Sequence, residues 1–208
     1  MTFPELAAFE EECADVDRTL AMVTAEDWGR HGLGEWTVAE LVAHMVRGAT
    51  RIDAYLGVAP RGKPIRDRVS YFQFDLETQA PVIAQRARQE AASINPEDLP
   101  ARFASGWRAS VDRAAALPPE HVIATFRGPM RLDEYAATRV VEMVVHHMDL
   151  RMALDQPPGA TPAAGRLAMS VLEGLLGSPR PRNHGRTRFI LAATGRISSA
   201  DDRFPVLR

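Results

Sequence analysis

Apolar residues recur at helical spacing along most of the chain. Near the amino terminus they follow one another at intervals of three or four residues, the period of one helix face; the series is Phe3, Leu6, Phe9, Cys13, Val16, Leu20 and Val23. Thr2 and Glu5 have the spacing of a capping box, so we expect the helix to begin there. Cys13 lies within the apolar face, which indicates a small buried hydrophobe rather than a reactive thiol.

The stretch GEWTVAELVAHMV carries the strongest helix-start signal in the chain. Thr37 and Glu40 form a predicted capping box, and Trp36 and Leu41 occupy the two positions of a hydrophobic staple. The apolar face that follows consists of Val38, Leu41, Val42, Met45, Ile52 and Leu56. We expect this helix to end at Gly57, because glycine commonly follows the last turn of a helix.

Two further helices are predicted before the middle of the chain. A helical pattern runs from Val69 to Ala87, and Pro81 within it predicts a kink or break near Thr78. Asn95, followed by proline and two acidic residues, has the features of a helix start. The helix that begins there is expected to reach Leu117.

The second half of the chain continues this helical pattern with two strand-like interruptions. The predicted elements are a β-like segment at 121–130, a central helix at Leu132–Leu154, a helix at about 162–176 after Thr161, a basic loop, and a strand-like run at 189–194. The sequence therefore predicts a mainly all-α protein. Residues 1–155 are expected to form an up-and-down four-helix bundle, and residues 156–208 a short carboxy-terminal extension.

Composition narrows the class of protein further. Of 208 residues, 46% are hydrophobic and 25% are charged, which is typical of a globular domain. The net charge of −2 gives no electrostatic case for nucleic-acid binding. No apolar run is long enough to span a membrane and no signal-peptide pattern is present, so we expect a cytoplasmic protein. The single cysteine excludes a cysteine-rich zinc site and an internal disulfide.

Polar residues in the central helix carry the candidate chemistry. Glu142, His146 and Asp149 are spaced by four and three residues, so they share one border of the apolar face. Arg139 precedes Glu142 by one turn on the same side. His147 points elsewhere, so the doubled histidine is not expected to supply two ligands to one ion.

The spacing of Glu142 and His146 suits a metal ion. A third ligand must come from another helix, and His44 lies at the margin of an apolar face with Gly48 leaving space beside it. Two histidines and one glutamate form a known zinc set that keeps a position open, and nickel or iron also accepts these ligands. The alternatives are a core-edge histidine at position 44 and a plain intrahelical ion pair between Arg139 and Glu142.

The stretches WTVAELVAHM and DEYAATRVVEMVVHHMDL together resemble the mycothiol-dependent maleylpyruvate isomerase family, within the DinB-like metal-binding helical bundles. The resemblance runs from about residue 5 to residue 155. It implies a divalent metal, usually zinc, held by His44, Glu142 and His146, and it implies mycothiol as the thiol cofactor.

The resemblance and the residues together suggest a metal-dependent enzyme that uses a low-molecular-weight thiol. The reaction would be isomerisation or thiol transfer on a small electrophilic, carboxylate-bearing substrate. Asp149 would orient His146, and Arg139, Arg47 or Arg51 would bind a carboxylate. The alternatives are a metallohydrolase on the same scaffold and a non-catalytic metal-binding or interaction bundle.

The sequence leaves two destinations for the apolar residues outside the bundle face. Val144, Val145 and Met148 would face either the partner subunit of a homodimer or the helix at about 167–176.

Overall fold

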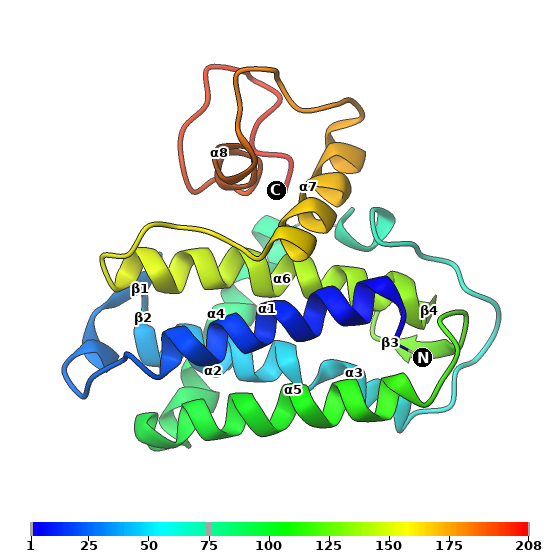
Figure 1. Ribbon diagram of the computed structural model, residues 1–208, viewed down its shortest axis with the longest axis horizontal. Coiled ribbons are helices and arrows are strands. Elements are labelled where there is room, and N and C mark those ends of the chain that lie inside the picture. Colours follow the sequence, from blue (N-terminus) through cyan, green and yellow to red (C-terminus); the bar gives the residue numbers. More distant parts are fainter. Residues whose placement is uncertain (1, 74–75, 208) are drawn as a thin grey trace.

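The computed structural model describes residues 2–73 and 76–207, and most of them are helical (Figure 1). The helices are α1 (Pro4–Leu20), α2 (Val38–Ala49), α3 (Arg51–Leu56), α4 (Leu76–Ala92), α5 (Leu99–Ala115), α6 (Leu132–Ala153), α7 (Pro162–Leu176) and α8 (Arg186–Ala193). Three 3-10 turns lie at Asp27–Gly29, Ser70–Phe72 and Pro96–Asp98. The strands are β1 (His31–Leu33), β2 (Trp36–Thr37), β3 (Val122–Thr125) and β4 (Gly128–Arg131), and they form two antiparallel pairs, β1–β2 and β3–β4.

Helices α1, α2, α5 and α6 form the predicted four-helix bundle. Each of α1 and α2 packs against both α5 and α6. Figure 1 shows α1 and α6 running in one direction and α2 and α5 running in the other. The order of directions is therefore up, down, down, up. The long connection between α3 and α5, which includes α4, carries the chain back to the end of the bundle where α2 begins, so that α5 runs parallel to α2. Helix α2 consequently lies antiparallel to α6, the helix with the polar strip.

The start of α2 follows the sequence signal closely. The side chain of Thr37 accepts a hydrogen bond from the backbone N–H of Glu40, and the Glu40 carboxylate accepts one from the backbone N–H of Thr37. This is the predicted capping box, and Trp36 and Leu41, the two positions of the predicted staple, are both buried. The helix, however, is interrupted at Thr50, so the expected single helix to Gly57 is divided into α2 and α3.

Ser110 of α5 explains this interruption. Its hydroxyl donates to the carbonyl of Ala49 at 2.7 Å and accepts from the backbone N–H of Asp53 at 3.3 Å. Ala49 and Asp53 are the carbonyl and N–H that would bond each other in a continuous α-helix. Insertion of a side chain into that ladder is a known cause of a helix break. Because the inserted hydroxyl belongs to α5, no local signal in the helix itself predicts the break.

Two predicted helix starts are wrong. Helix α1 begins at Pro4 with Phe3 as its N-cap, and no side chain caps it, so Thr2 and Glu5 do not form the predicted box. Proline at the first helical position has no N–H that needs a partner, which removes part of the need for a side-chain cap. Helix α4 begins at Leu76 rather than Val69, and it continues through Pro81, so of the expected kink or break near Thr78 the break does not occur.

The strand-like segments have different outcomes. The β-like segment at 121–130 is confirmed as the β3–β4 hairpin. The run at 189–194 was predicted as a strand, which is wrong: it belongs to α8, which also takes up the end of the expected basic loop. A short, fully buried apolar run has no periodicity that separates a strand from a helix. Phe189 and Ile190 are buried here, where α8 packs against α7, and the strands of the described residues form two hairpins in other segments of the chain.

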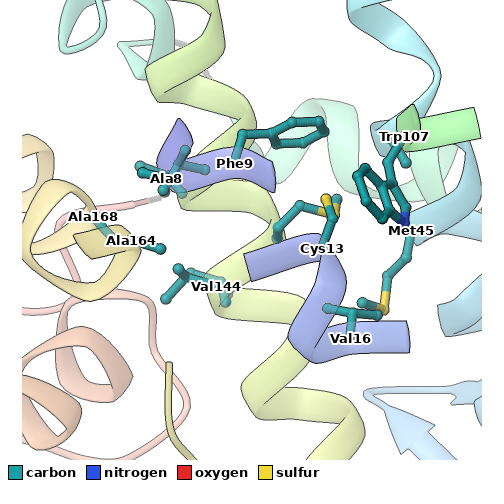
Figure 2. Packing of buried hydrophobic residues seen from close by; sticks show 14 of the residues in the cluster. Ala8, Phe9, Cys13, Val16, Met45, Trp107, Val144, Ala164 and Ala168 are labelled. Atoms are coloured by element: carbon teal, nitrogen blue, oxygen red, sulfur yellow. The ribbon is translucent and has the colours of Figure 1, made fainter. Parts of the chain in front are cut away.

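The bundle and the carboxy-terminal segment share one core. Figure 2 shows Cys13 packed among apolar residues that include Met45 and Trp107, and its side chain is fully buried as predicted. In the same view Val144 of α6 faces Ala164 and Ala168 of α7. Val145 and Met148 are also buried within the chain. Among the described residues, no helix is both long and apolar enough to cross a membrane.

A buried polar network fastens α7 to the bundle. The fully buried carboxyl group of Glu12 accepts hydrogen bonds from the backbone N–H and the hydroxyl of Thr161, the residue before α7, at 2.8 and 2.9 Å. Nδ1 of His147 lies 2.8 Å from the other Glu12 oxygen. Nε2 of His147 accepts from Nε of Arg151 at 3.1 Å, so Nδ1 carries the ring hydrogen and donates to Glu12. His147 is therefore a structural core residue.

We predict that His147→Ala lowers the free energy of unfolding by about 2–4 kcal/mol, because it removes the donor that His147 gives to Oε1 of the buried Glu12 carboxylate. The measurement is urea unfolding of the metal-free protein. His146→Ala is the matched control: it is the same change one residue away, and the His146 side chain is 14% exposed. Equal losses of stability in the two variants would contradict this account.

Candidate functional site

The antiparallel helices α2 and α6 bring the three predicted ligands together. Nε2 of His44 on α2 lies 3.5 Å from Oε1 of Glu142 on α6. The rings of His44 and His146 meet edge to face with their centroids 4.8 Å apart. Trp36 packs against the other side of His44, with 5.1 Å between ring centroids. The three side chains are between 14% and 16% exposed, so the cluster is largely buried but still reached by solvent.

Gly48 leaves space on α2 that the ends of two α6 side chains occupy. A Cβ atom at Gly48 would lie 2.6 Å from Oε1 of Glu142 and 2.8 Å from Cε of Met143. Both distances are shorter than real contacts of a Cβ atom. Gly48 follows His44 by one helical turn, so the space it leaves is filled by the Glu142 carboxylate beside the His44 ring. Any larger residue here would push Glu142 away from His44.

Burial and neighbouring charges keep His44 neutral. Desolvation, together with the repulsion of His146, lowers the pKa of His44 to about 4, although Glu142 acts in the opposite direction. The His44–Glu142 contact is consequently not an ion pair at neutral pH. Burial by itself would raise the pKa of Glu142, but Arg139 and then His44 lower it, so this carboxyl group is ionised. A neutral imidazole and a carboxylate are the forms in which these groups bind metals.

Arg139 is turned inward toward Glu142. Its guanidinium group donates to Oε2 of Glu142 and to the hydroxyl groups of Thr138 and Tyr71. It also lies over the rings of Tyr71 and Tyr135, with 5.5 and 4.9 Å to their centroids. The Arg139 side chain is 6% exposed. The charge of Arg139 therefore balances Glu142 and leaves Oε1 of that carboxylate facing His44.

Asp149 contacts His146 in the predicted way. Nδ1 of His146 lies 3.0 Å from Oδ2 of Asp149, one turn further along α6. Burial alone would raise the pKa of Asp149, but hydrogen bonds from His146 and Arg196 lower it. An ionised Asp149 accepts a hydrogen bond, so the Nδ1 of His146 carries the hydrogen. In the neutral ring the lone pair then resides on Nε2.

The other two predicted arginines, on α2 and at the start of α3, already have partners. Arg47 donates to Glu90 of α4 at 2.6 Å. The guanidinium of Arg51 lies over the ring of Tyr55, 5.8 Å from its centroid. Both side chains are half-buried. A carboxylate ligand would have to compete with Glu90 for Arg47. The ring contact of Arg51 with Tyr55 does not use the N–H groups of its guanidinium.

The donor set and one measured distance fit a metal ion. At zinc–ligand distances of 2.0–2.1 Å, two ligands of a tetrahedral site are separated by about 3.3 Å, and His44 Nε2 and Glu142 Oε1 are separated by 3.5 Å. The space left by Gly48 and the neutrality of His44 also suit a cation. Within residues 2–73 and 76–207, however, no three His, Cys, Asp or Glu side chains are already arranged as a complete set of metal ligands.

A hollow of about 810 Å³ lies on the other side of Asp149. Its wall is formed by the β1 region, by the end of α6 and by residues 194–196 after α8, and includes Asp149 and Arg196. His44 and Glu142 do not line it. The Asp149–Arg196 pair therefore lies at the wall of this hollow, and His146 does not line it.

Sequence reasoning did not place two of the residues that contact the cluster. Tyr71, which bonds Arg139, lies in a 3-10 turn of a segment that was expected to be a regular helix. Arg196, which bonds Asp149, follows α8, which was expected to be a strand. In both cases the misassigned local structure hid the direction of the side chain.

The fold and the cluster define a helical-bundle protein with two histidines and a glutamate at the junction of α2 and α6. A family model described as the mycothiol maleylpyruvate isomerase N-terminal domain matches residues 9–151, and the chain belongs to this family. The matched range contains His44, Glu142, His146 and Asp149. The resemblance predicted from the sequence is confirmed.

Solved structures agree with this assignment. A crystal structure of the mycothiol-dependent maleylpyruvate isomerase matches with 17% identity and a TM-score of 0.57. A histidine-to-alanine mutant of that isomerase matches with 16% identity and a TM-score of 0.56. Each comparison covers 85% of this chain and 72% of the other. At such identity the likeness is one of fold. No curated protein matches the chain.

We predict that His44 of the metal-free protein stays neutral down to a pH of about 4. Between this value and the ordinary pKa of about 6.5, the unfolded chain binds a proton that the folded chain does not. The free energy of unfolding therefore falls as the pH is lowered through this window, by an amount on the order of 3 kcal/mol from this group. The measurements are NMR titration of the ring and urea unfolding across this range.

His44→Gln is the control for this prediction, because it removes the titrating group and retains a polar side chain of similar reach. The wild-type protein should lose more stability than the variant between pH 6.5 and 4. A His44 ring that titrates near 6.5 would show that the site is more hydrated than its burial indicates.

Proposed function

We propose that the chain is a metal-dependent enzyme that uses a low-molecular-weight thiol on a small electrophilic substrate. The observation that carries the proposal is the convergence of two imidazoles and a carboxylate from two helices at a position that solvent still reaches. Family membership supports mycothiol as the thiol and isomerisation or thiol transfer as the reaction.

His44, Glu142 and His146 would hold the divalent metal, for which zinc is the first choice and nickel or iron the alternatives. A bound cation of this kind lowers the pKa of a coordinated thiol, so that the thiol is present as the nucleophilic thiolate at neutral pH. Arg139 fixes Glu142, and Asp149 fixes the ring of His146. Both roles act on the ligands rather than on the substrate.

The chain itself offers no sulfur nucleophile. Burial, with the nearby charges of Glu12 and Asp17, raises the pKa of the Cys13 thiol well above its usual range. Cys13 is the single cysteine of the sequence and its side chain lies in the core. A thiol reaction at the His44 cluster therefore requires a thiol from outside, which agrees with the use of a small thiol by the family.

The substrate carboxylate has two candidate partners that follow His44 closely in the sequence. Arg47 lies on α2, three residues after His44, and Arg51 is the first residue of α3, directly after the break at Thr50. Arg51 is the better candidate, because its donors are not taken by a carboxylate, whereas Arg47 bonds Glu90. A guanidinium group there would bind a carboxylate through two parallel hydrogen bonds.

We predict that His44→Ala and Glu142→Gln each lower the zinc affinity by more than about 100-fold. Loss of a residue that only hydrogen-bonds a metal ligand costs up to about 100-fold, and loss of the ligand itself should cost more. The measurement is competition with a chromophoric chelator, using protein stripped of metal and reloaded. The same variants should abolish thiol-dependent isomerisation of an α,β-unsaturated carboxylate, followed by its ultraviolet absorption with mycothiol present.

Three outcomes of this experiment separate the competing functions. Absence of stoichiometric metal in the reloaded wild type would overturn the proposal. Metal binding with hydrolysis of esters or amides, and no dependence on thiol, would favour a metallohydrolase. Metal binding with neither activity would favour a non-catalytic bundle.

We further predict that Gly48→Ala weakens zinc binding by at least about tenfold, because its Cβ atom would displace the Glu142 carboxylate. Gly29→Ala is the matched control, since a Cβ atom there meets nothing within 4 Å. Affinity is read from the same chelator competition, with circular dichroism to confirm that both variants are folded. Equal affinities would contradict the role given to the space at Gly48.

A further inference from the structure

The residue that holds Asp149 in place comes from the carboxy-terminal segment. Nε of Arg196 donates to Oδ1 of Asp149 at 3.1 Å, and a terminal nitrogen donates to Oδ2 at 2.8 Å. The geometry points to Arg196 as a positioning residue that acts through Asp149 on the ring of His146. This inference rests on the proposed function, because His146 matters there as a metal ligand.

Asp149 depends on this arginine because it has no access to water. Its side chain is 1% exposed, so both carboxylate oxygens need partners within the protein. Oδ1 bonds Arg196, and Oδ2 is shared between Arg196 and Nδ1 of His146. If Arg196 were removed, a buried carboxylate would keep one donor only, and it would turn toward another partner or take up a proton. Either change releases the ring of His146.

The backbone holds Arg196 in place without help from its side chain. Helix α8 ends with Gly195 in the left-handed conformation at φ 75°. The N–H of Arg196 bonds the carbonyl of Leu191 at 2.8 Å, and the N–H of Gly195 bonds that of Ala192 at 3.1 Å. These are the two bonds of a Schellman motif. A variant that lacks only the guanidinium group should therefore keep the segment where it is.

The remaining donor of Arg196 fixes the direction of the guanidinium plane. Its other terminal nitrogen donates to the carbonyl of Thr194 at 2.7 Å. The side chain is 18% exposed and lines the hollow beside Asp149. Two hydrogen bonds to Asp149 and one to the backbone leave a single orientation, which a lysine cannot reproduce with its single point charge.

The first test uses metal-free protein and reads the tautomer of His146. Long-range 1H–15N spectra of the wild type should show the ring hydrogen on Nδ1. Arg196→Gln should show His146 exchanging between both tautomers in a protein that remains folded. Arg188→Gln is the matched control, because Arg188 lies on α8 and no hydrogen bond joins it to Asp149 in the described part of the chain. An unchanged tautomer in Arg196→Gln would overturn the inference.

The second test measures the metal directly. Arg196→Gln should weaken zinc binding by about 10–100-fold, the range typical for loss of an outer partner of a ligand, and should shift the visible absorption of the cobalt-loaded protein. The zinc affinity of Arg196→Lys should lie between that of Arg196→Gln and that of the wild type. A lower melting temperature with unchanged zinc affinity would mean that Arg196 only docks the segment, and would overturn the inference.

The two tests distinguish a failure of the proposed function from a failure of the positioning role of Arg196. If the wild type binds no zinc or cobalt, the proposed function fails, while the tautomer experiment still decides whether Arg196 positions His146. If the wild type binds metal and Arg196→Gln binds it with equal affinity and an equal cobalt spectrum, the positioning role fails and the proposed function stands.

Discussion

The space that Gly48 leaves on α2 for the Glu142 side chain of α6 is the constraint on which the site depends. A glycine on one helix lets the Glu142 carboxylate of the other occupy the space beside its backbone. That single contact places an anionic oxygen 3.5 Å from a neutral histidine nitrogen inside a bundle. The antiparallel packing of the two helices is in turn set by the long connection that separates α2 from α5, because it lets α2 run against α6 (Figure 1).

Helix α6 serves two purposes on two of its sides. His147 faces α1 and joins the Glu12 network that fastens α7 to the bundle, and its ring is fully buried. His146, one residue earlier and about 100° around the helix, faces α2 and remains partly exposed. Adjacent identical residues therefore have different roles because the helix turns them into different surroundings. A substitution at His147 should therefore act mainly on the stability of the fold, and one at His146 mainly on the proposed metal site.

The sequence predicts those features that depend on local periodicity and misses those that depend on a distant partner. The capping box at Thr37, the central helix and the shared side of Glu142, His146 and Asp149 follow from spacing along one segment. The break at Thr50 and the helical state of residues 189–193 do not, because they depend on Ser110 from α5 and on packing against α7. The pairing of Arg196 with Asp149 could not be predicted for the same reason.

The charges around the cluster bear on the kind of ligand that the proposed metal would favour. Glu142 is balanced by Arg139 and Asp149 by Arg196, and His44 is neutral, so these groups carry no excess negative charge. Under the proposed function, a divalent cation would therefore bring two uncompensated positive charges into a largely buried place. Two anions would neutralise them at short range, where the low local dielectric makes the attraction strong. A thiolate and a substrate carboxylate supply such a pair, which makes thiol chemistry on a carboxylate-bearing substrate electrostatically better suited to this site than the binding of neutral ligands alone.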